Sequence, residues 1–277
     1  MPLNIDIFGS PKALVGMVHV GALPGTPRHE TSIAEIADRA ASEARLLAEA
    51  GFDAIVIENM HDVPYLMRRV GPEIVSSMTV SAQAVRAAVE VPVGVQVLAG
   101  ANDAAIAVAH AAACDFVRCE GFVYASVADE GVFAEADAGP LLRYRRAIGA
   151  DGSGPSGKRI HVLADIKKKH NAHAITSDVD LAETARTAEF CRADGVIVTG
   201  VATGRPTSVN DLRTVRQATK LPMAVGSGAR PETLQELFAY ADAVIVGSWY
   251  KQGGSWSSPP DPERVRDLVS AAERARL

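Results

Sequence analysis

The chain has 277 residues, of which 48% are hydrophobic and 5% aromatic, and its formal net charge is −5. This length suits one large barrel or two small domains, and the chain has no run approaching the ~20 apolar residues that a membrane span needs. The negative charge and the scarcity of aromatic residues argue against a nucleic-acid binder. Because the first residues lack a basic region followed by an apolar stretch, we expect no secretory signal and a cytoplasmic location.

Short β-branched runs alternate with longer alanine-rich segments. Each short run is nearly continuous in apolar residues, as is typical of parallel strands covered on both faces. The predicted strands are Ala13–Val18, Ala54–Ile57, Val93–Leu98, Phe116–Cys119, Ile160–Ile166, Gly195–Thr199, Met223–Val225 and Ala243–Val246. Eight strand–helix units in this length predict one α/β domain over residues 1–277, a (β/α)₈ TIM barrel. An open doubly wound sheet is disfavoured because no Gly-x-Gly-x-x-Gly turn follows the first strand.

Capping residues mark the helices between these strands. We predict that Thr31 or Ser32 caps the first helix and that Gly51 ends it. Later helices are predicted to begin at Gly71-Pro72, Asn102 or Asp103, Pro140, Ser177 or Asp178, Ser208, Pro231 and Asp261-Pro262. The long segment 120–139 is expected to form a loop over the barrel mouth.

Two matched glycine turns follow the last two predicted strands. They read Gly226-Ser227-Gly228 and Gly247-Ser248. Glycine lets backbone N–H groups approach an anion closely, serine adds a hydroxyl donor, and the following helix adds a favourable dipole. Turn glycines that any barrel needs are the alternative, but two matched turns in consecutive units favour a phosphate site. This segment resembles the last two strands of the ribulose-phosphate-binding barrels.

The fifth predicted strand carries charged residues toward the barrel mouth, where barrel enzymes have their chemistry. Strand alternation places Asp165 and Lys167 on the inner face, where they could exchange protons or polarise a carbonyl. A structural ion pair is the alternative. Asp165-x-Lys167 followed by His170 is similar to the Asp-x-Lys-x-x-Asp motif of the orotidine phosphate decarboxylase group, with histidine in place of the second aspartate. We favour a cationic Lys167 that stabilises an enolate over a Schiff-base nucleophile.

Other polar residues also follow predicted strands. His19 and Glu58 are further catalytic candidates, since a histidine can shuttle protons and a carboxylate can act as a base. Both could instead be structural. The candidates for binding substrate are Asn59, Arg118, Glu120, Lys169, His170 and Thr199. No metal ligand set is predicted because no histidine–carboxylate spacing is specific, and no cofactor follows, although a divalent metal stays open.

Taken together, these segments resemble the BtpA/SgcQ family. The matching segments are Leu14–His19 with Leu23-Pro24-Gly25, Gly51–Asp53 with Glu58-Asn59, Asp165–His170, Val198–Gly204 and Gly226–Gly228. The resemblance spans essentially the whole chain. It implies a barrel with either sugar-phosphate chemistry or a role in photosystem I biogenesis.

We therefore expect an enzyme that acts on a sugar phosphate or a nucleotide-like phosphate, of the isomerase, epimerase, aldolase or lyase type. The alternative is a non-catalytic assembly or stability factor that keeps the ligand pocket. A charged, open barrel mouth would favour the enzyme, and a mouth filled by bulky side chains would favour the assembly factor. The alanine-rich helices also suggest a homo-oligomer.

Overall fold

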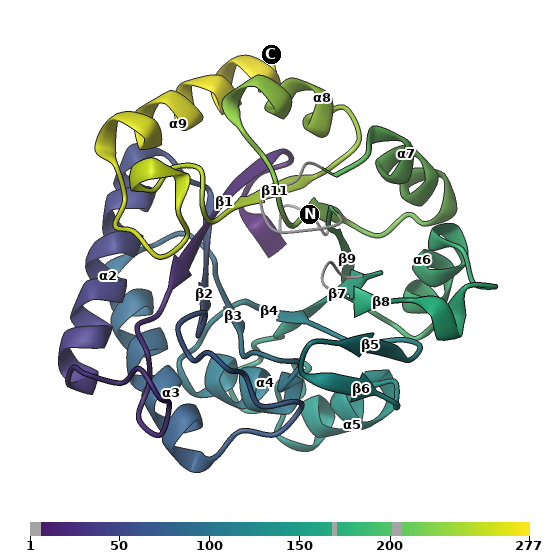
Figure 1. Cartoon of the computed structure of the whole chain (residues 1–277), viewed down its shortest axis with the longest axis horizontal. Coiled ribbons are helices and arrows are strands. Elements are labelled where there is room, and N and C mark those ends of the chain that lie inside the picture. The colour runs from purple at the N-terminus through teal and green to yellow at the C-terminus, as the bar shows by residue number, and fades with distance from the viewer. Residues whose placement is uncertain (1–6, 168–170, 201–206) are drawn as a thin grey trace.

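The computed structural model describes residues 7–167, 171–200 and 207–277, and in these residues eight parallel strands close into a barrel surrounded by helices (Figure 1). The TIM-barrel prediction is confirmed. The strands, in chain order, are β1 (Ala13–His19), β2 (Ala54–Glu58), β3 (Val93–Gln96), β4 (Phe116–Cys119), β7 (His161–Ile166), β9 (Gly195–Val198), β10 (Met223–Val225) and β11 (Ala243–Val246). The first strand closes the barrel by pairing with both β2 and β11.

The outer helices follow the predicted order. They are α2 (Ile33–Ala50), α3 (Pro72–Ala88), α4 (Asn102–Ala111), α5 (Ala138–Ala147), α6 (Leu181–Phe190), α7 (Val209–Ala218), α8 (Leu234–Phe238) and α9 (Pro262–Arg276). Ser32 caps α2 in a reciprocal capping box with Glu35, and Gly51 ends this helix in the left-handed conformation. The caps expected for α2 and its C-terminus are therefore confirmed.

Three helix starts differ from the prediction. Helix α5 begins two residues before Pro140, and α6 is capped by Asp180 rather than by Ser177 or Asp178, which follow a short 3₁₀ turn. The segment after Pro231 is a 3₁₀ turn followed by the five-residue α8. So short a helix has few aligned peptide dipoles, and it adds little of the favourable field expected at the glycine turn.

Small and apolar side chains fill the lower half of the barrel, at the amino ends of the strands. A buried cluster there joins Val15, Val56, Leu163 and Ile197 with Ile7 and Phe8, which precede β1. The ring of Phe8 packs edge-on against Phe116 of β4, with 5.7 Å between ring centroids. The segment before β1 therefore closes this end of the barrel with apolar side chains.

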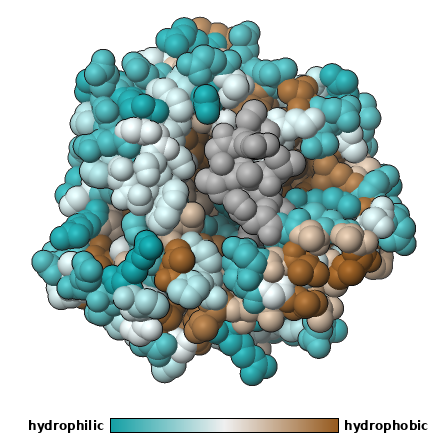
Figure 2. All heavy atoms as spheres, in the orientation of Figure 1, coloured by the Kyte–Doolittle hydropathy of each residue, from teal (hydrophilic) through white to brown (hydrophobic). Residues whose placement is uncertain are grey.

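The segment predicted as a loop over the mouth contains two strands. Strands β5 (Ser126–Ala128) and β6 (Gly131–Phe133) form an antiparallel hairpin, and β8 (Asn171–Ala172) pairs with β5. Figure 2 shows hydrophobic side chains over this part of the surface, where Val127 and Val132 are exposed. Arg68, from the connection after β2, donates to the carbonyl oxygens of Gly121 and Glu135 and so holds the base of the hairpin.

The capping box of α2 predicts a measurable contribution to stability. Replacing Ser32 with alanine removes the oxygen that accepts from the Glu35 amide, so we expect the free energy of unfolding to fall by about 1 kcal/mol in urea denaturation. Ser42→Ala, at an exposed position inside the same helix, should change it by less than about 0.5 kcal/mol. Equal effects of the two substitutions would contradict the role of the cap.

Candidate active site at the barrel mouth

A cavity of about 490 Å³ lies at the carboxyl ends of the strands. Nine of the residues predicted from the sequence line it: His19, Glu58, Arg118, Glu120, Gly226, Ser227, Gly228, Gly247 and Ser248. The tip of the β5–β6 hairpin contributes Asp129 and Glu130, and the connection from β11 to α9 contributes Trp249 and Trp256. The mouth is therefore open and charged rather than filled by bulky side chains.

A buried ion pair stands in the middle of the mouth. Arg118 on β4 donates from Nε to both carboxylate oxygens of Asp165 on β7, at 3.3 and 3.0 Å. Burial alone would lower the pKa of Arg118, but the carboxylates of Asp165, Glu58 and Glu120 raise this pKa above its usual value. The guanidinium is therefore a permanent cation. Within the described chain only its Nε donates a hydrogen bond to protein, while the residue itself lines the cavity.

The glycine turns approach these charged side chains closely. A Cβ atom at Gly226 would lie 3.2 Å from Nη2 of Arg118 and 2.9 Å from the methyl group of Thr199. A Cβ atom at Gly247 would lie 3.2 Å from Nε2 of His19. The absence of a side chain lets the backbone at Gly226 lie beside the Arg118 cation, and the backbone at Gly247 lie beside the His19 imidazole.

Ser227, Gly228 and Ser248 in the same turns belong to the residues that line the cavity. Among the described residues, none accepts a hydrogen bond from the amides of Ser227, Gly228 or Ser248. The hydroxyl of Ser227 accepts from the Gly200 amide at 3.1 Å, which ties the β10 turn to the end of β9. The turns can therefore offer N–H donors to an anion.

Two arginines that the sequence analysis did not select extend this wall of the cavity. Arg230 follows the β10 turn, and Arg264 belongs to α9. Arg264 donates from Nε to the Trp249 carbonyl at 2.6 Å, and its guanidinium lies 4.5 Å from the centroid of the Trp249 ring. Both sit in polar segments without strand periodicity, so no pattern distinguished them from surface arginines.

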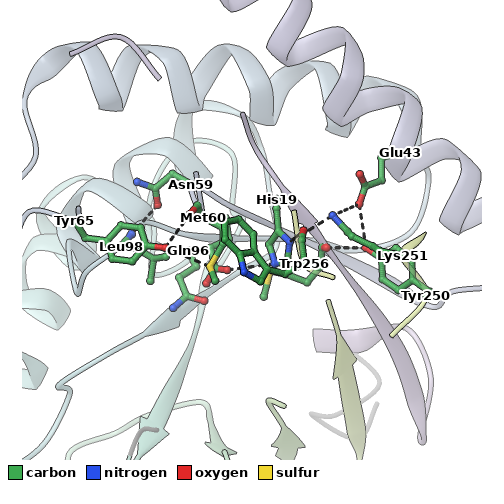
Figure 3. A network of polar contacts seen from close by, with 12 residues as sticks. His19, Glu43, Asn59, Met60, Tyr65, Gln96, Leu98, Tyr250, Lys251 and Trp256 are labelled. Carbon is green, nitrogen blue, oxygen red and sulfur yellow. Dashed lines mark hydrogen bonds and ion pairs between the residues drawn. The ribbon is translucent and has the colours of Figure 1, made fainter. Parts of the chain in front are cut away.

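The imidazole of His19 lies at the end of β1 beside Glu58. These residues are register partners on β1 and β2, so both side chains point the same way, and Nε2 of His19 is 3.6 Å from Oε2 of Glu58. On the other side, Nδ1 of His19 is 2.9 Å from the carbonyl oxygen of Trp256 (Figure 3). The indole ring of Trp256 packs edge-on against the imidazole.

Behind His19 lies a charged network that the sequence analysis also missed. Nζ of Lys251 is 3.4 Å from Nδ1 of His19 and 3.1 Å from the Glu43 carboxylate on α2 (Figure 3). The Tyr250 hydroxyl donates to Glu43 at 3.0 Å and lies 2.7 Å from the Met17 carbonyl. Burial raises the pKa of Glu43, while the ammonium of Lys251 acts in the opposite direction.

Asn59 and Thr199 lie near the mouth but are not among the cavity-lining residues. Asn59 accepts from the Leu98 amide at 2.7 Å and donates to Asp62 at 2.8 Å, so its amide joins the connections that follow β2 and β3 (Figure 3). Thr199 is buried at the end of β9. Their predicted contacts with substrate stay predictions.

The structure places Lys167 differently from the sequence-based expectation, which put it beside Asp165 on the inner face of the strand. Asp165 is paired with Arg118, and Lys167 is half-buried outside the lining of the cavity. Strand β7 ends at Ile166, and Lys167 has φ of 46°, so the alternation of the strand does not extend to its side chain. Lys169 and His170, predicted to bind substrate, lie outside the described residues.

Within residues 7–167, 171–200 and 207–277, no three histidine, cysteine, aspartate or glutamate side chains converge as metal ligands. No helix in the described part of the chain is long and apolar enough to span a bilayer.

Comparison with known proteins gives a full-length match. The model of the BtpA family matches residues 10–274. An uncharacterized mitochondrial protein of Caenorhabditis elegans is 42% identical over 269 residues, which cover 95% of this chain and 94% of the relative. The photosystem I biogenesis protein BtpA of Synechocystis sp. is 34% identical over 265 residues, which cover 95% of this chain and 89% of the relative.

Among solved structures, the chain is similar to phosphoribosyl anthranilate isomerase from Thermus thermophilus. The TM-score is 0.55 at 14% identity, over 95% of this chain and 98% of the isomerase. At this identity the likeness shows a shared barrel fold and no shared activity.

The central ion pair predicts a large loss of stability when one partner is removed. Arg118→Met leaves the Asp165 carboxylate buried without its guanidinium, so we expect the free energy of unfolding to fall by about 3–5 kcal/mol in urea denaturation. The double variant Arg118→Met/Asp165→Leu should recover most of this loss, because it removes both members of the pair.

Arg146→Met is the matched control, since it breaks an exposed ion pair with Asp151. It should cost less than about 1 kcal/mol. A loss for Arg118→Met as small as that of the control would show that Asp165 does not depend on the pair.

Proposed function

The chain belongs to the BtpA family, and from its open, charged cavity we propose that it is an enzyme acting on a phosphorylated small molecule. One observation carries this proposal. The glycine turns after β10 and β11 border the same cavity as His19 and Glu58, and a Cβ atom at Gly247 would lie 3.2 Å from Nε2 of His19. A sugar phosphate or a nucleotide-like phosphate has the chemistry that such a cavity would hold.

In this proposal the phosphate lies against the turns after β10 and β11. The amides of Ser227, Gly228 and Ser248 donate to its oxygens, as backbone N–H groups do in other phosphate-binding loops. Arg264 adds a positive charge from α9, and Arg118 adds one from the centre of the mouth. Several such charge-assisted contacts give orientation as well as affinity.

The reacting carbon then lies near His19 and Glu58. Either group can remove a proton from a carbon next to a carbonyl, and the other can return it. Arg118 lies where a developing enolate oxygen would be stabilised by a fixed cation. These roles fit isomerase, epimerase, aldolase and lyase reactions. The structural neighbour from Thermus thermophilus is named as an isomerase of a phosphoribosyl compound, which agrees with this class without determining it.

The alternative function is assembly rather than catalysis. It is favoured by the Synechocystis relative, which is named a photosystem I biogenesis protein. The charged, open mouth supports the enzyme, because a pure assembly factor needs no buried cation facing a cavity. A cytoplasmic location and self-association stay predictions. The name of the Caenorhabditis elegans relative gives a mitochondrial location for that protein.

Phosphate binding is the first test. We expect inorganic phosphate and glycerol phosphate to bind in isothermal titration calorimetry, and Arg264→Gln to weaken this binding about 10-fold because one charge-assisted contact is lost. Arg274→Gln changes an exposed arginine on the same helix and should leave the affinity unchanged. No binding by the unmodified chain, or equal losses in both variants, would contradict the site.

Proton exchange is the second test. In deuterated buffer, ¹H NMR of a panel of aldose and ketose phosphates should show loss of the proton next to the carbonyl for the unmodified chain. Glu58→Gln should slow this exchange by 100-fold or more, roughly the contribution of a general base. Lys167→Met, with borohydride trapping in parallel, tests the role in catalysis that the sequence analysis predicted for Lys167. A trapped adduct at Lys167 would replace the His19–Glu58 mechanism with Schiff-base chemistry.

A further inference from the structure

Lys251 is a buried lysine whose side chain is only 2% exposed. It lies in the connection between β11 and α9, and it is not one of the residues that line the cavity. A buried ammonium is costly unless it is paired, and the Glu43 carboxylate at 3.1 Å supplies the pair. The chain thus carries a buried cation directly behind His19 and outside the lining of the cavity.

The geometry around His19 decides which nitrogen carries the proton. A carbonyl oxygen can only accept, so the 2.9 Å contact between Nδ1 and the Trp256 carbonyl requires a proton on Nδ1. The ammonium of Lys251 is also only a donor, and it is more distant at 3.4 Å. Lys251 therefore acts on His19 through its charge rather than through a hydrogen bond.

With Nδ1 protonated, Nε2 of a neutral His19 is an acceptor, and it faces Glu58. Two acceptors 3.6 Å apart favour one shared proton. The carboxylate of Glu58 favours a charged imidazolium, and the ammonium of Lys251 opposes it. The opposed charges of Glu58 and Lys251 therefore bear directly on whether the His19 ring is neutral or charged.

Other charged groups surround this pair. Glu43 faces Lys251 from α2, and Arg118 acts on Glu58 from β4. The ring of His61 lies tilted against Trp256, with 4.9 Å between the ring centroids. Burial lowers the pKa of His61, and the positive charges of Lys251 and Arg28 lower it further. The field of Lys251 thus extends to both imidazoles that contact Trp256.

We propose that Lys251, anchored by Glu43, is a positioning residue that keeps His19 neutral with its proton on Nδ1, so that Nε2 is the proton acceptor of the cavity. The statement that Nε2 acts on a ligand rests on the proposed function. The protonation state itself does not, because it belongs to the free protein. Lys251 reaches the reaction only through His19.

NMR titration of histidine-labelled protein without ligand tests this inference. His19→Gln identifies the His19 signals among the seven histidines. Near neutral pH the ¹⁵N shifts should show a neutral ring protonated at Nδ1. In Lys251→Met the midpoint of the His19 titration should rise by about 1 pH unit, because a like charge within 4 Å has been removed.

A second variant keeps the test valid if Lys251→Met does not fold. Glu43→Gln/Lys251→Met removes both charges and leaves no unpaired buried ion, and the midpoint should again rise because the nearer charge was the lysine. Lys158→Met is the control, since it breaks an ion pair with Asp115 at the amino ends of the strands and should leave His19 unchanged.

A wild-type ring protonated at Nε2, or a midpoint that does not rise in either variant, would overturn the proposal. So would an equal shift in Lys158→Met. A failure of phosphate binding would leave this measurement intact, so the two proposals can fail separately.

Discussion

The ion pair between Arg118 and Asp165 is the interaction on which the mouth of this barrel depends. Below it, the interior consists of small and apolar side chains closed by Ile7 and Phe8. Above it, the lining is charged. Because Asp165 binds the guanidinium through Nε, the pair fixes a cation at the boundary and orients it toward the turn at Gly226. A cation at this depth without its carboxylate would draw water into the barrel or force the side chain out.

Gly226 and Gly247 bring the backbone of the two turns close to charged and polar side chains of the mouth. The missing side chain at Gly226 admits the end of Arg118, and the missing side chain at Gly247 admits the ring of His19. A group bound on the amides of these turns would therefore lie beside both the permanent cation and the imidazole. Proximity of this kind is what lets binding energy at one end of a ligand orient a reaction at the other.

The barrel could be predicted from the sequence because its strands are buried on both faces and read as continuous apolar runs. The helix caps at Ser32 and Gly51 were predictable because each depends on one residue type at the helix end. A serine oxygen accepts from a backbone amide, and glycine tolerates the left-handed conformation. The β5–β6 hairpin was not, because its strands have three residues each and depend on packing with the mouth and on Arg68.

The cavity lining was predictable because chemistry in barrels lies where strands end. This rule selected His19, Glu58, Arg118 and the two glycine turns, all of which line the cavity. Strand alternation does not extend to Lys167, where the strand has ended and the backbone turns left-handed. The buried position of Lys251 could not be predicted, because it lies beside a segment rich in glycine, serine and proline that has no strand or helix periodicity. Its partner Glu43 belongs to a helix about 200 residues earlier in the chain.

The apolar closure by Ile7 and Phe8 affects how a ligand could reach and leave the cavity. Among the described residues these apolar side chains close the amino end of the barrel, and the cavity lies at the other end, where the β5–β6 hairpin and the two tryptophans border it. In the proposed enzyme, a product would have to leave by this end before the next substrate could enter. Product release and substrate binding would then use the same end of the barrel, so slow product release would delay the binding of the next substrate.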